Sequence, residues 1–368
     1  MVQPTTVDEV IDAVAGSAGL NIHGGRSKQD MWREAPDLTA LDMRGMAGII
    51  DHDPDELIIT VRAGTLLAEV EQVLAARGQM LAFEPFDHGP LFGRAAGAST
   101  IGGIVAANVS GSRRVSAGAA RDHVLGFEAV SGQGEAFKGG GKVVKNVTGY
   151  DLPKLLAGSW GTLAVLTEIT LRVLPAAKAE QTLLLSGLDE ARAVAAMGQA
   201  LSLPASVSGA ALMDGVAALR IEGFAPSVVA RIAALGRALA GFGPGTIIAG
   251  SESRDWWARL ASFGWSDPTQ PLWRVIVPPA AGADAGAALG GRRVYDWGGG
   301  LIWVEGPAAP DVAGIARSFG GHARPVRVNG PAVAAEGGGA LAALNARVKL
   351  AFDPQGKLNP GINMAGAA

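Results

Sequence analysis

Apolar and polar residues alternate along several segments of the first half of the chain, and these segments predict strands. From Leu163 to Val173 every second residue is apolar or β-branched, which predicts a long strand with one buried face. Leu57 to Arg62 predicts another strand, and Val124 to Val130 with Glu135 to Lys138 flank a turn that is typical of a hairpin. Helical spacing of apolar residues replaces this alternation from Leu66 to Ala76. These patterns predict a sheet with helices packed against it.

Patterns at both ends of the chain also predict helices. The order Thr6, Val7, Asp8, Glu9 is a capping box and predicts a helix that runs through Ala15. Near the other end, Leu341 to Phe352 predicts a helix, followed by a polar tail through Gly361. We expect this tail to return to the first half of the chain.

After Pro175 the composition changes. Short strands then alternate with alanine-rich helices, which is typical of an α+β arrangement with helices on one face of a sheet. The predicted strands are Thr182–Leu185, Ala217–Ile221, Thr246–Ile248, Trp273–Val277 and Leu301–Val304, and the helices are Asp189–Leu201, Ser227–Leu239 and Asp311–Phe319. Pro278 to Gly291 is rich in Ala and Gly and predicts a loose surface segment. The predicted fold class is therefore α+β, with a two-subdomain unit over 1–175, a smaller domain over 176–335, and a helix and tail over 336–368.

Composition and charge exclude several functions. The net charge of −3 and the scattered Lys and Arg residues argue against a nucleic-acid partner. The chain has no cysteine, so disulfides, thiolate catalysis and Cys-ligated clusters are excluded, and its five histidines lack metal-ligand spacing. No G-x-G-x-x-G motif opens a helix after the first strand, which argues against a nicotinamide Rossmann fold. The first ten residues do not resemble a signal peptide, and no apolar run reaches membrane-spanning length.

The first candidate loop is Gly24 to Lys28. Its two adjacent glycines permit backbone conformations in which consecutive N–H groups form a concave anion site. Ser27 adds a hydroxyl donor, and Arg26 or Lys28 adds positive charge, which together suit a pyrophosphate. The alternative is an ordinary tight turn.

The second candidate loop spans Gly97 to Gly111. Small residues are so frequent here that the backbone is bare on one side, as a flat ligand lying against it would require. Thr100 is a candidate cap of a short helix whose N-terminus faces a phosphate. The alternative is a close helix crossing that needs small side chains.

The third candidate element joins Lys145–Leu152 to Gly158–Leu163. Asp151 is a candidate N-cap, with Pro153 just inside a helix. Gly158, Gly161 and Thr162 then allow a tight turn into the strand that follows. Backbone groups along that strand could read the polar edge of a purine or of a flavin pyrimidine.

Together these motifs resemble the FAD-binding domain of the vanillyl-alcohol oxidase and p-cresol methylhydroxylase family, over about Thr5 to Pro175 and Asp353 to Gly361. The resemblance implies two α+β subdomains that enclose FAD and a cap domain over the isoalloxazine. It implies that the pyrophosphate lies at the first loop, the flavin and its ribityl chain along the second, and the adenine half near the third. The implied cofactor-binding residues are Gly24, Gly25, Arg26, Ser27, Lys28, Pro85, Ala98, Ser99, Thr100, Ile101, Gly102, Gly103, Ala107, Asn108, Lys145, Tyr150, Gly158, Gly161, Thr162, Val165, Thr167 and Asn359.

Within that family, the third element resembles the E subunits of bacterial glycolate oxidase, whereas the catalytic D subunits usually carry Glu at the position of Trp160. Family members with a histidyl-linked flavin usually have His where this chain has Arg26, so the resemblance, with the lack of cysteine, implies noncovalent FAD. The His-rich Gly-Asp-Gly-Asn-type motif of the catalytic subunits is absent, and no catalytic residue is assigned.

The resemblance thus implies an FAD-binding, cytoplasmic subunit that oxidises glycolate only with a catalytic flavin D subunit and an iron–sulfur F subunit, through which any membrane association would arise. A non-catalytic assembly subunit and a stand-alone oxidoreductase for 2-hydroxy acids or alcohols remain alternatives. Trp256, Trp257 and the strand Trp273–Val277 are candidates for the contact surface with partners.

Overall fold

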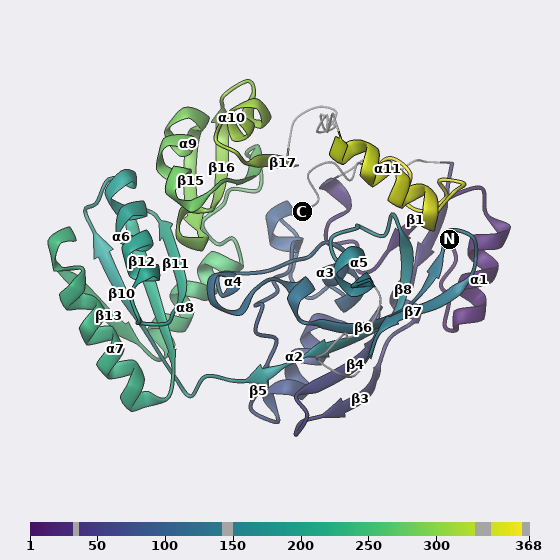
Figure 1. Ribbon diagram of the computed structural model, residues 1–368, viewed down its shortest axis with the longest axis horizontal. Helices are drawn as coiled ribbons and strands as arrows, with labels where there is room; N and C mark the ends of the chain where they lie inside the picture. Colours follow the sequence, from purple (N-terminus) through teal and green to yellow (C-terminus); the bar gives the residue numbers. More distant parts are fainter. Residues whose placement is uncertain (32–36, 142–149, 328–339, 363–368) are drawn as a thin grey trace.

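The computed structural model describes residues 1–31, 37–141, 150–327 and 340–362. The chain forms two halves that lie side by side, each built around its own antiparallel sheet (Figure 1). Helix and sheet are mixed in both halves, which confirms the predicted α+β class.

The first sheet comprises, within the described residues, five strands in the order β3-β4-β8-β6-β7. They are β3 (Ile49–Asp53), β4 (Ile58–Arg62), β6 (Val124–Ser131), β7 (Ala136–Gly140) and β8 (Ala164–Arg172). The pairing of β6 with β7 confirms the predicted hairpin. Strand β8 is buried on both faces rather than on one, because helices cover both sides of the sheet: Ile169 belongs to one core cluster and Val165 to another.

Different helices cover the two sides of the first sheet. One side is covered by α2 (Leu67–Ala75), α3 (Ile101–Ala106) and α5 (Leu152–Leu156). The other is covered by α1 (Val7–Gly16), whose start confirms the predicted cap: the Thr6 hydroxyl accepts a hydrogen bond from the Glu9 N–H. The Glu9 carboxylate in turn accepts from the Thr5 N–H. Beside α1 lies a parallel pair of strands, β1 (Leu20–His23) and β2 (Thr39–Asp42).

The second sheet comprises eight strands, counted over the described residues, in the order β13-β10-β12-β11-β15-β16-β14-β17. They are β10 (Ala179–Ser186), β11 (Val207–Met213), β12 (Val216–Gly223), β13 (Gly245–Ala249), β14 (Leu272–Ile276), β15 (Gly290–Asp296), β16 (Leu301–Ala308) and β17 (His322–Arg327). All five predicted strands of this half are present. The short strands β5 (Gln79–Met80) and β9 (Leu174–Pro175) pair at the junction of the halves.

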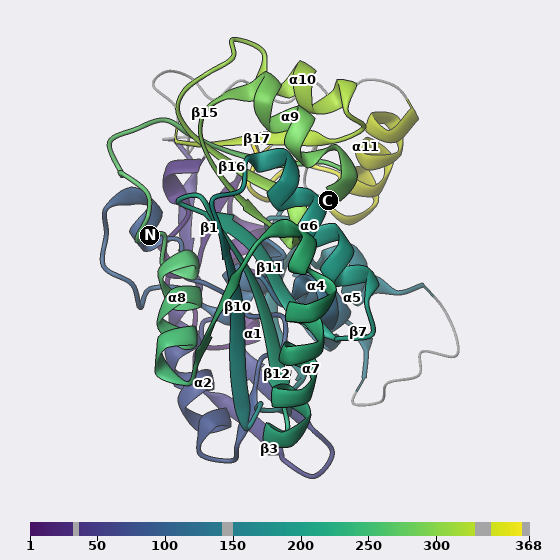
Figure 2. The same cartoon turned by 90° about the vertical axis from the view of Figure 1, so that its left-hand side faces the viewer.

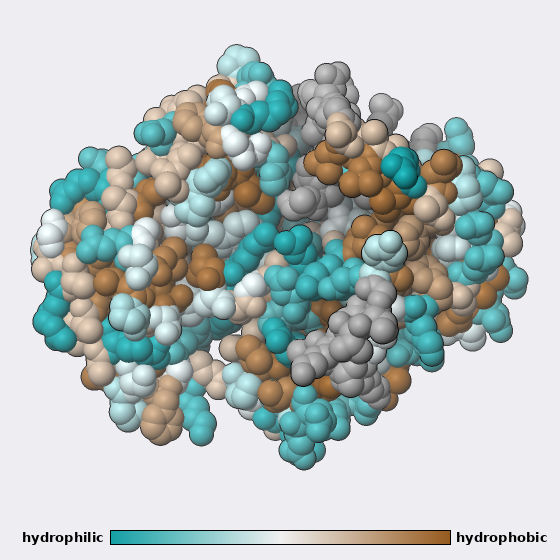
Figure 3. All heavy atoms as spheres, viewed as in Figure 1, coloured by the Kyte–Doolittle hydropathy of each residue, from teal (hydrophilic) through white to brown (hydrophobic). Residues whose placement is uncertain are grey.

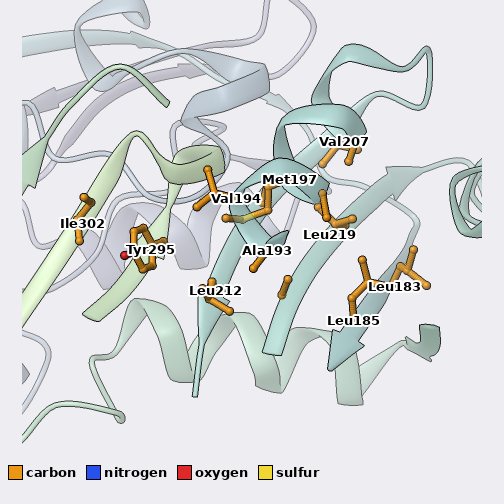
Figure 4. Packing of buried hydrophobic residues seen from close by; sticks show 14 of the residues in the cluster. Leu183, Leu185, Ala193, Val194, Met197, Val207, Leu212, Leu219, Tyr295 and Ile302 are labelled. Carbon is orange, nitrogen blue, oxygen red and sulfur yellow. The ribbon is translucent and has the colours of Figure 1, made fainter. Parts of the chain in front are cut away.

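The two faces of the second sheet have different neighbours. On the outer face, α6 (Glu190–Ser202), α7 (Ala225–Ala238), α9 (Gly282–Leu289) and α10 (Val312–Ser318) enclose a cluster that contains Met197, Leu219 and Tyr295 (Figure 4). The inner face packs against α8 (Ser251–Ala261) and against Leu91 of the first half. Figure 2 shows α7 and α8 on opposite sides of β10, so helices cover both faces rather than one.

Two expectations about surfaces are wrong. The segment Pro278–Gly291 contains helix α9, in which Leu289 is fully buried, rather than a loose surface stretch. Its glycines reflect close packing, since a Cβ at Gly282 would lie 2.3 Å from a backbone oxygen. Trp257 is buried and donates its indole N–H to the Thr182 hydroxyl, and β14 lies inside the sheet between β16 and β17. Trp257 therefore cannot belong to a partner surface, whereas Trp256 and β14 are partly exposed and stay candidates.

The C-terminal segment lies along the first half. Helix α11 (Ala340–Phe352) is followed by a stretch in which Leu358 forms a parallel bridge with Leu20 of β1. The Asp353 carboxylate fixes this turn by accepting hydrogen bonds from the Lys357 and Leu358 N–H groups. Hydrophobic side chains gather over α11 in Figure 3, in agreement with the exposure of its leucines, Leu341, Leu344 and Leu350.

Candidate functional site

A cavity lies in the first half, where β1, α3 and the loop before β8 meet. It encloses about 760 Å³ not occupied by protein atoms, counting its open mouth. Its walls are mostly backbone and apolar side chains with few polar groups. The lining residues are Ile22, His23, Gly24, Gly25, Arg26, Ser27, Lys28, Gln29, Met43, Ala63, Thr100, Gly102, Gly103, Ala106, Ala107, Trp160, Gly161, Ala164, Leu166 and Asn359.

The first loop is fitted closely to the second. A Cβ at Gly24 would lie 2.1 Å from the Thr100 hydroxyl oxygen, and one at Gly25 would lie 1.4 Å from the Ala98 carbonyl oxygen. Only glycine therefore allows the two backbones to approach this closely. A hydrogen bond of 3.1 Å between the hydroxyls of Ser27 and Ser99 completes the contact.

The second loop opens α3, and its two glycines have different roles. The Thr100 hydroxyl accepts from the Gly103 N–H and caps the helix. A Cβ at Gly102 would lie 2.8 Å from the Ala63 carbonyl oxygen, so Gly102 allows α3 to approach the turn after β4 closely. Both glycines line the cavity, and a Cβ at Gly103 would come 3.8 Å from the Lys28 ammonium nitrogen.

Asp87 holds the start of the second loop. Its carboxylate accepts hydrogen bonds of 2.9 Å from the N–H groups of Gly97 and Ser99, and one of 2.7 Å from Gly89. Three backbone donors on one carboxylate fix this loop in place. No role was assigned to this residue from the sequence.

The third loop is tied to α3 and to the C-terminal tail. Trp160 has a left-handed backbone with φ of +56°, and its N–H donates to the Ala106 carbonyl. The Asn359 amide bridges two walls of the cavity: its Nδ2 donates to the Trp160 carbonyl at 2.8 Å, and its Oδ1 accepts from the Ile22 N–H at 2.6 Å. Asn359, from the C-terminal tail, thus links β1 to the third loop.

Lys28 places a buried positive charge in the cavity wall. Its side chain is 6% exposed, and burial lowers its pKa from 10.5 to about 8, although the nearby charge of Asp87 acts in the opposite direction. Among the described residues, no carboxylate lies within ion-pair distance of its ammonium group. The wall therefore holds a cation that an anionic ligand would neutralise.

The structure brings eleven of the expected residues to the cavity: Gly24, Gly25, Arg26, Ser27, Lys28, Thr100, Gly102, Gly103, Ala107, Gly161 and Asn359. Others stand behind its wall. Ile101 is fully buried in the core beneath it, and the Asn108 amide oxygen accepts from the Arg121 N–H instead. Pro85, Ala98, Ser99, Gly158 and Thr162 support the loops without lining the cavity.

Three further expected residues do not line the cavity. Strand β8 presents Ala164 and Leu166 to the cavity, whereas the Val165 side chain packs in the cluster beneath α1. Thr167 does not line the cavity. Tyr150 is 92% exposed. Lys145 lies outside the described residues.

Sequence reasoning did not assign Ile22, His23, Gln29, Met43, Ala63, Ala106, Trp160, Ala164 or Leu166, all of which line the cavity. Ala164 and Leu166 alternate with Val165 and lie on the other face of the strand, but both faces are buried and alternation alone does not choose between them. Met43 comes from a turn after β2 and has no local signal of this kind.

A buried ionic network joins the two halves. The Arg220 guanidinium of β12, 1% exposed, lies 2.8 Å from the Glu84 carboxylate of the first half and 3.3 Å from Glu222. Arg113 of the first half contacts the same two carboxylates. Burial alone would raise the pKa of Glu222, but its contacts with Arg113 and the charge of Arg220 lower it to about 2.

Two structural absences hold for the described part of the chain. No group of three or more His, Cys, Asp or Glu residues is placed to hold a metal ion. Among the same residues, no helix has both the length and the apolar character needed to cross a membrane.

Comparisons with known proteins agree with this geometry. A family model described as an FAD binding domain matches residues 1–140. The chain is 36% identical to the glycolate oxidase subunit GlcE of Escherichia coli (strain K12), over 96% of this chain and 95% of that protein. It is 31% identical to the glycolate oxidase subunit GlcD of Bacillus subtilis (strain 168), but over 47% of this chain and 34% of that one. The structure of an alkyldihydroxyacetonephosphate synthase matches with a TM-score of 0.68 at 16% identity, covering 98% of this chain and 75% of that chain, which shows a shared fold.

Proposed function

Because the chain belongs to the family of FAD-dependent oxidoreductases that includes glycolate oxidase subunit GlcE, we propose that it is the FAD-binding subunit of a glycolate oxidase complex. The complex oxidises glycolate to glyoxylate, and this chain acts in it together with a catalytic flavin subunit and an iron–sulfur subunit. The observation that carries the proposal is the cavity in which all three predicted loops meet around the buried charge of Lys28.

The residues of the cavity fit FAD. The bare backbone of Gly24 and Gly25 and the Lys28 ammonium suit the pyrophosphate, since adjacent N–H groups and a buried cation both favour an anion. The apolar walls at Ala164 and Leu166 suit flat rings. When bound, FAD supplies a two-electron acceptor, and the chain's own groups bind it, orient it and exclude water.

The proposed attachment is noncovalent. Arg26 occupies the position after the paired glycines, and the chain contains no cysteine. Precipitation with acid should therefore leave the yellow flavin in the supernatant. Flavin that remains in the protein pellet would refute noncovalent binding.

The proposed domain boundaries follow the two sheets. Residues 1–175 with the tail 336–368 form the FAD domain, and residues 176–335 form the cap. Support comes from the separate cores of the two sheets and from the bridge between Leu20 and Leu358.

Reconstitution tests the dependence on partners. The purified chain alone should show negligible glycolate-dependent dye reduction, and addition of the catalytic and iron–sulfur subunits should restore it. The Lys28→Met variant should lower the reconstituted rate, whereas Lys138→Met, which alters an exposed lysine of β7, should not. A chain that turns over glycolate alone at the rate of the full complex would favour a stand-alone oxidase.

A further inference from the structure

The arginines on the inner face of the second sheet differ in whether a carboxylate neutralises them. Arg220 of β12 is paired with Glu84 and Glu222, as described above. Arg274 of β14 and Arg324 of β17 form no ion pair and no side-chain hydrogen bond with the residues that the structure describes. The inner face therefore carries two positive charges, those of Arg274 and Arg324, that take no part in the ionic network between the halves.

The direction of these two side chains follows from strand alternation. On β14, Leu272 belongs to the inner cluster and Val275 to the outer one, so Arg274 shares the inner face with Leu272. On β17, Ala323 belongs to the outer cluster, so Arg324 also points inward. Arg274 and Arg324 are direct partners in the antiparallel register, which places them next to each other on that face.

Aromatic rings locate the pair at the edge of the cavity. The Arg324 guanidinium lies 4.4 Å from the ring centroid of Trp160, a residue that lines the cavity. The Arg274 guanidinium lies 5.3 Å from the ring of Trp297, and Arg114 of helix α4 (Arg114–Ala117) lies 4.4 Å from the same ring. Three guanidinium groups thus gather where the third loop meets the second sheet.

The electrostatics of this cluster are unfavourable as it stands. Burial, with the charges of Arg114 and Arg324 acting in the same direction, lowers the pKa of Arg274 to about 9. Burial likewise lowers the pKa of Arg324 to about 10. Both residues nevertheless keep part of their surface exposed. Cations in such an environment are stabilised when an anion joins them.

We propose that Arg274 and Arg324, with Arg114 beside them, form a binding site for the carboxylate of a small organic acid at the rim of the cofactor cavity. Planar guanidinium groups match a carboxylate in fork geometry, and an adjacent pair offers more donors than one carboxylate needs. The site rests on the proposed function, which supplies the acid. It goes beyond that function, because this chain itself, and not only a partner subunit, would contact the organic acid.

The test uses the FAD-loaded chain, with FAD occupancy read from visible absorbance in the same sample. Isothermal titration with glycolate should give saturable binding, and ethylene glycol, which lacks the carboxylate, should give none. Arg274→Gln and Arg324→Gln should each weaken glycolate binding about 10-fold or more, the scale of a lost charge-assisted hydrogen bond. The matched control is Arg254→Gln on α8, an exposed arginine, which should leave binding unchanged.

A melting experiment separates a ligand site from a structural role. Without glycolate, Arg274→Gln should melt at or above the wild-type temperature, because it removes an uncompensated charge. Glycolate should raise the melting temperature of the wild type but not that of the variant. A large fall in the melting temperature of the ligand-free variant would mean that Arg274 is structural, and would overturn the proposal.

The remaining outcomes are distinguishable. Yellow, FAD-loaded chain that binds no glycolate would refute this site and leave the cofactor assignment intact. A chain that takes up no FAD would refute the proposed function itself. Loss of FAD from Arg274→Gln and Arg324→Gln, with glycolate absent from all samples, would assign the cluster to the cofactor's phosphates and overturn the proposal.

Discussion

Replacement of Lys28 by Met should weaken FAD binding while stabilising the protein without FAD. The side chain is 6% exposed and sits in the cavity wall, so Met fills a similar volume but carries no charge. A tenfold change in a protonation equilibrium is worth about 1.4 kcal/mol, so lowering the pKa from 10.5 to about 8 corresponds to about 3 kcal/mol against the charged form. The FAD-free variant should therefore be more stable than the wild type by up to about 3 kcal/mol at neutral pH.

The effect on FAD has the opposite sign. A charge-assisted contact with the pyrophosphate contributes about 1.5–3 kcal/mol, so the dissociation constant of FAD should rise about 10- to 100-fold in Lys28→Met. Titration of apoprotein with FAD, followed by quenching of flavin fluorescence, measures this change. The control is Lys138→Met, which removes an exposed lysine and should bind FAD as the wild type does.

The pH dependence follows from the same group. Because the folded pKa of Lys28 lies below the unfolded one, the unfolded chain binds more protons between about pH 8 and 10.5. The contribution of Lys28 to the stability of the FAD-free protein should therefore improve as pH rises through this window, and it should be absent in Lys28→Met. Equal FAD affinity in wild type and variant, with parallel stability profiles across that window, would refute the reasoning.

Three further substitutions test the architecture of the site. Gly103→Val should reduce FAD affinity in the fluorescence titration with little change in melting temperature, whereas Gly102→Val should lower the melting temperature because its Cβ would meet the Ala63 carbonyl; the reverse pattern would mean that the roles of the two glycines are exchanged. Glu84→Gln should destabilise the protein in urea unfolding by about 3 kcal/mol, the low end for a broken buried pair because Arg220 keeps Glu222, and unchanged stability would show that the network is dispensable. Asn359→Ala should cost about 1–3 kcal/mol in the same assay by leaving the Ile22 N–H and the Trp160 carbonyl unpaired, and a smaller loss would show that water replaces the amide.

The sequence predicted the elements where alternation or capping was local. Strands β4 and β8, the β6–β7 hairpin and helix α1 all follow from patterns within about ten residues. Helix α9 was missed because its Ala and Gly residues are typical of a loose segment, whereas here they allow close packing. A Cβ at Gly286, for example, would lie 1.9 Å from the Tyr295 hydroxyl, a contact that no local pattern contains.

The site was predictable in its loops but not in its walls. Glycine clustering located Gly24, Gly25 and Gly103, because bare backbone is needed wherever chain segments or a ligand approach closely. It did not reveal that β8 would turn Leu166 rather than Val165 toward the cavity, since both faces of that strand are buried and alternation alone does not choose between them.

The arginine cluster illustrates a second limit. Arg274 and Arg324 are distant in sequence, and each is unremarkable in its own segment. They become neighbours only through the register of β14 with β17, and the absence of a carboxylate partner among the described residues is a property of the packed halves. In the sequence these arginines are scattered singly, and their juxtaposition arises only in the folded chain.

The visible absorbance spectrum of the chain purified alone tests the central claim most directly. The account predicts a flavin spectrum with stoichiometric FAD, with no partner subunit present, because all three loops and Lys28 belong to this chain. A colourless chain that remains colourless after incubation with FAD, although it is folded by circular dichroism, would contradict the assignment of the cavity as an FAD site.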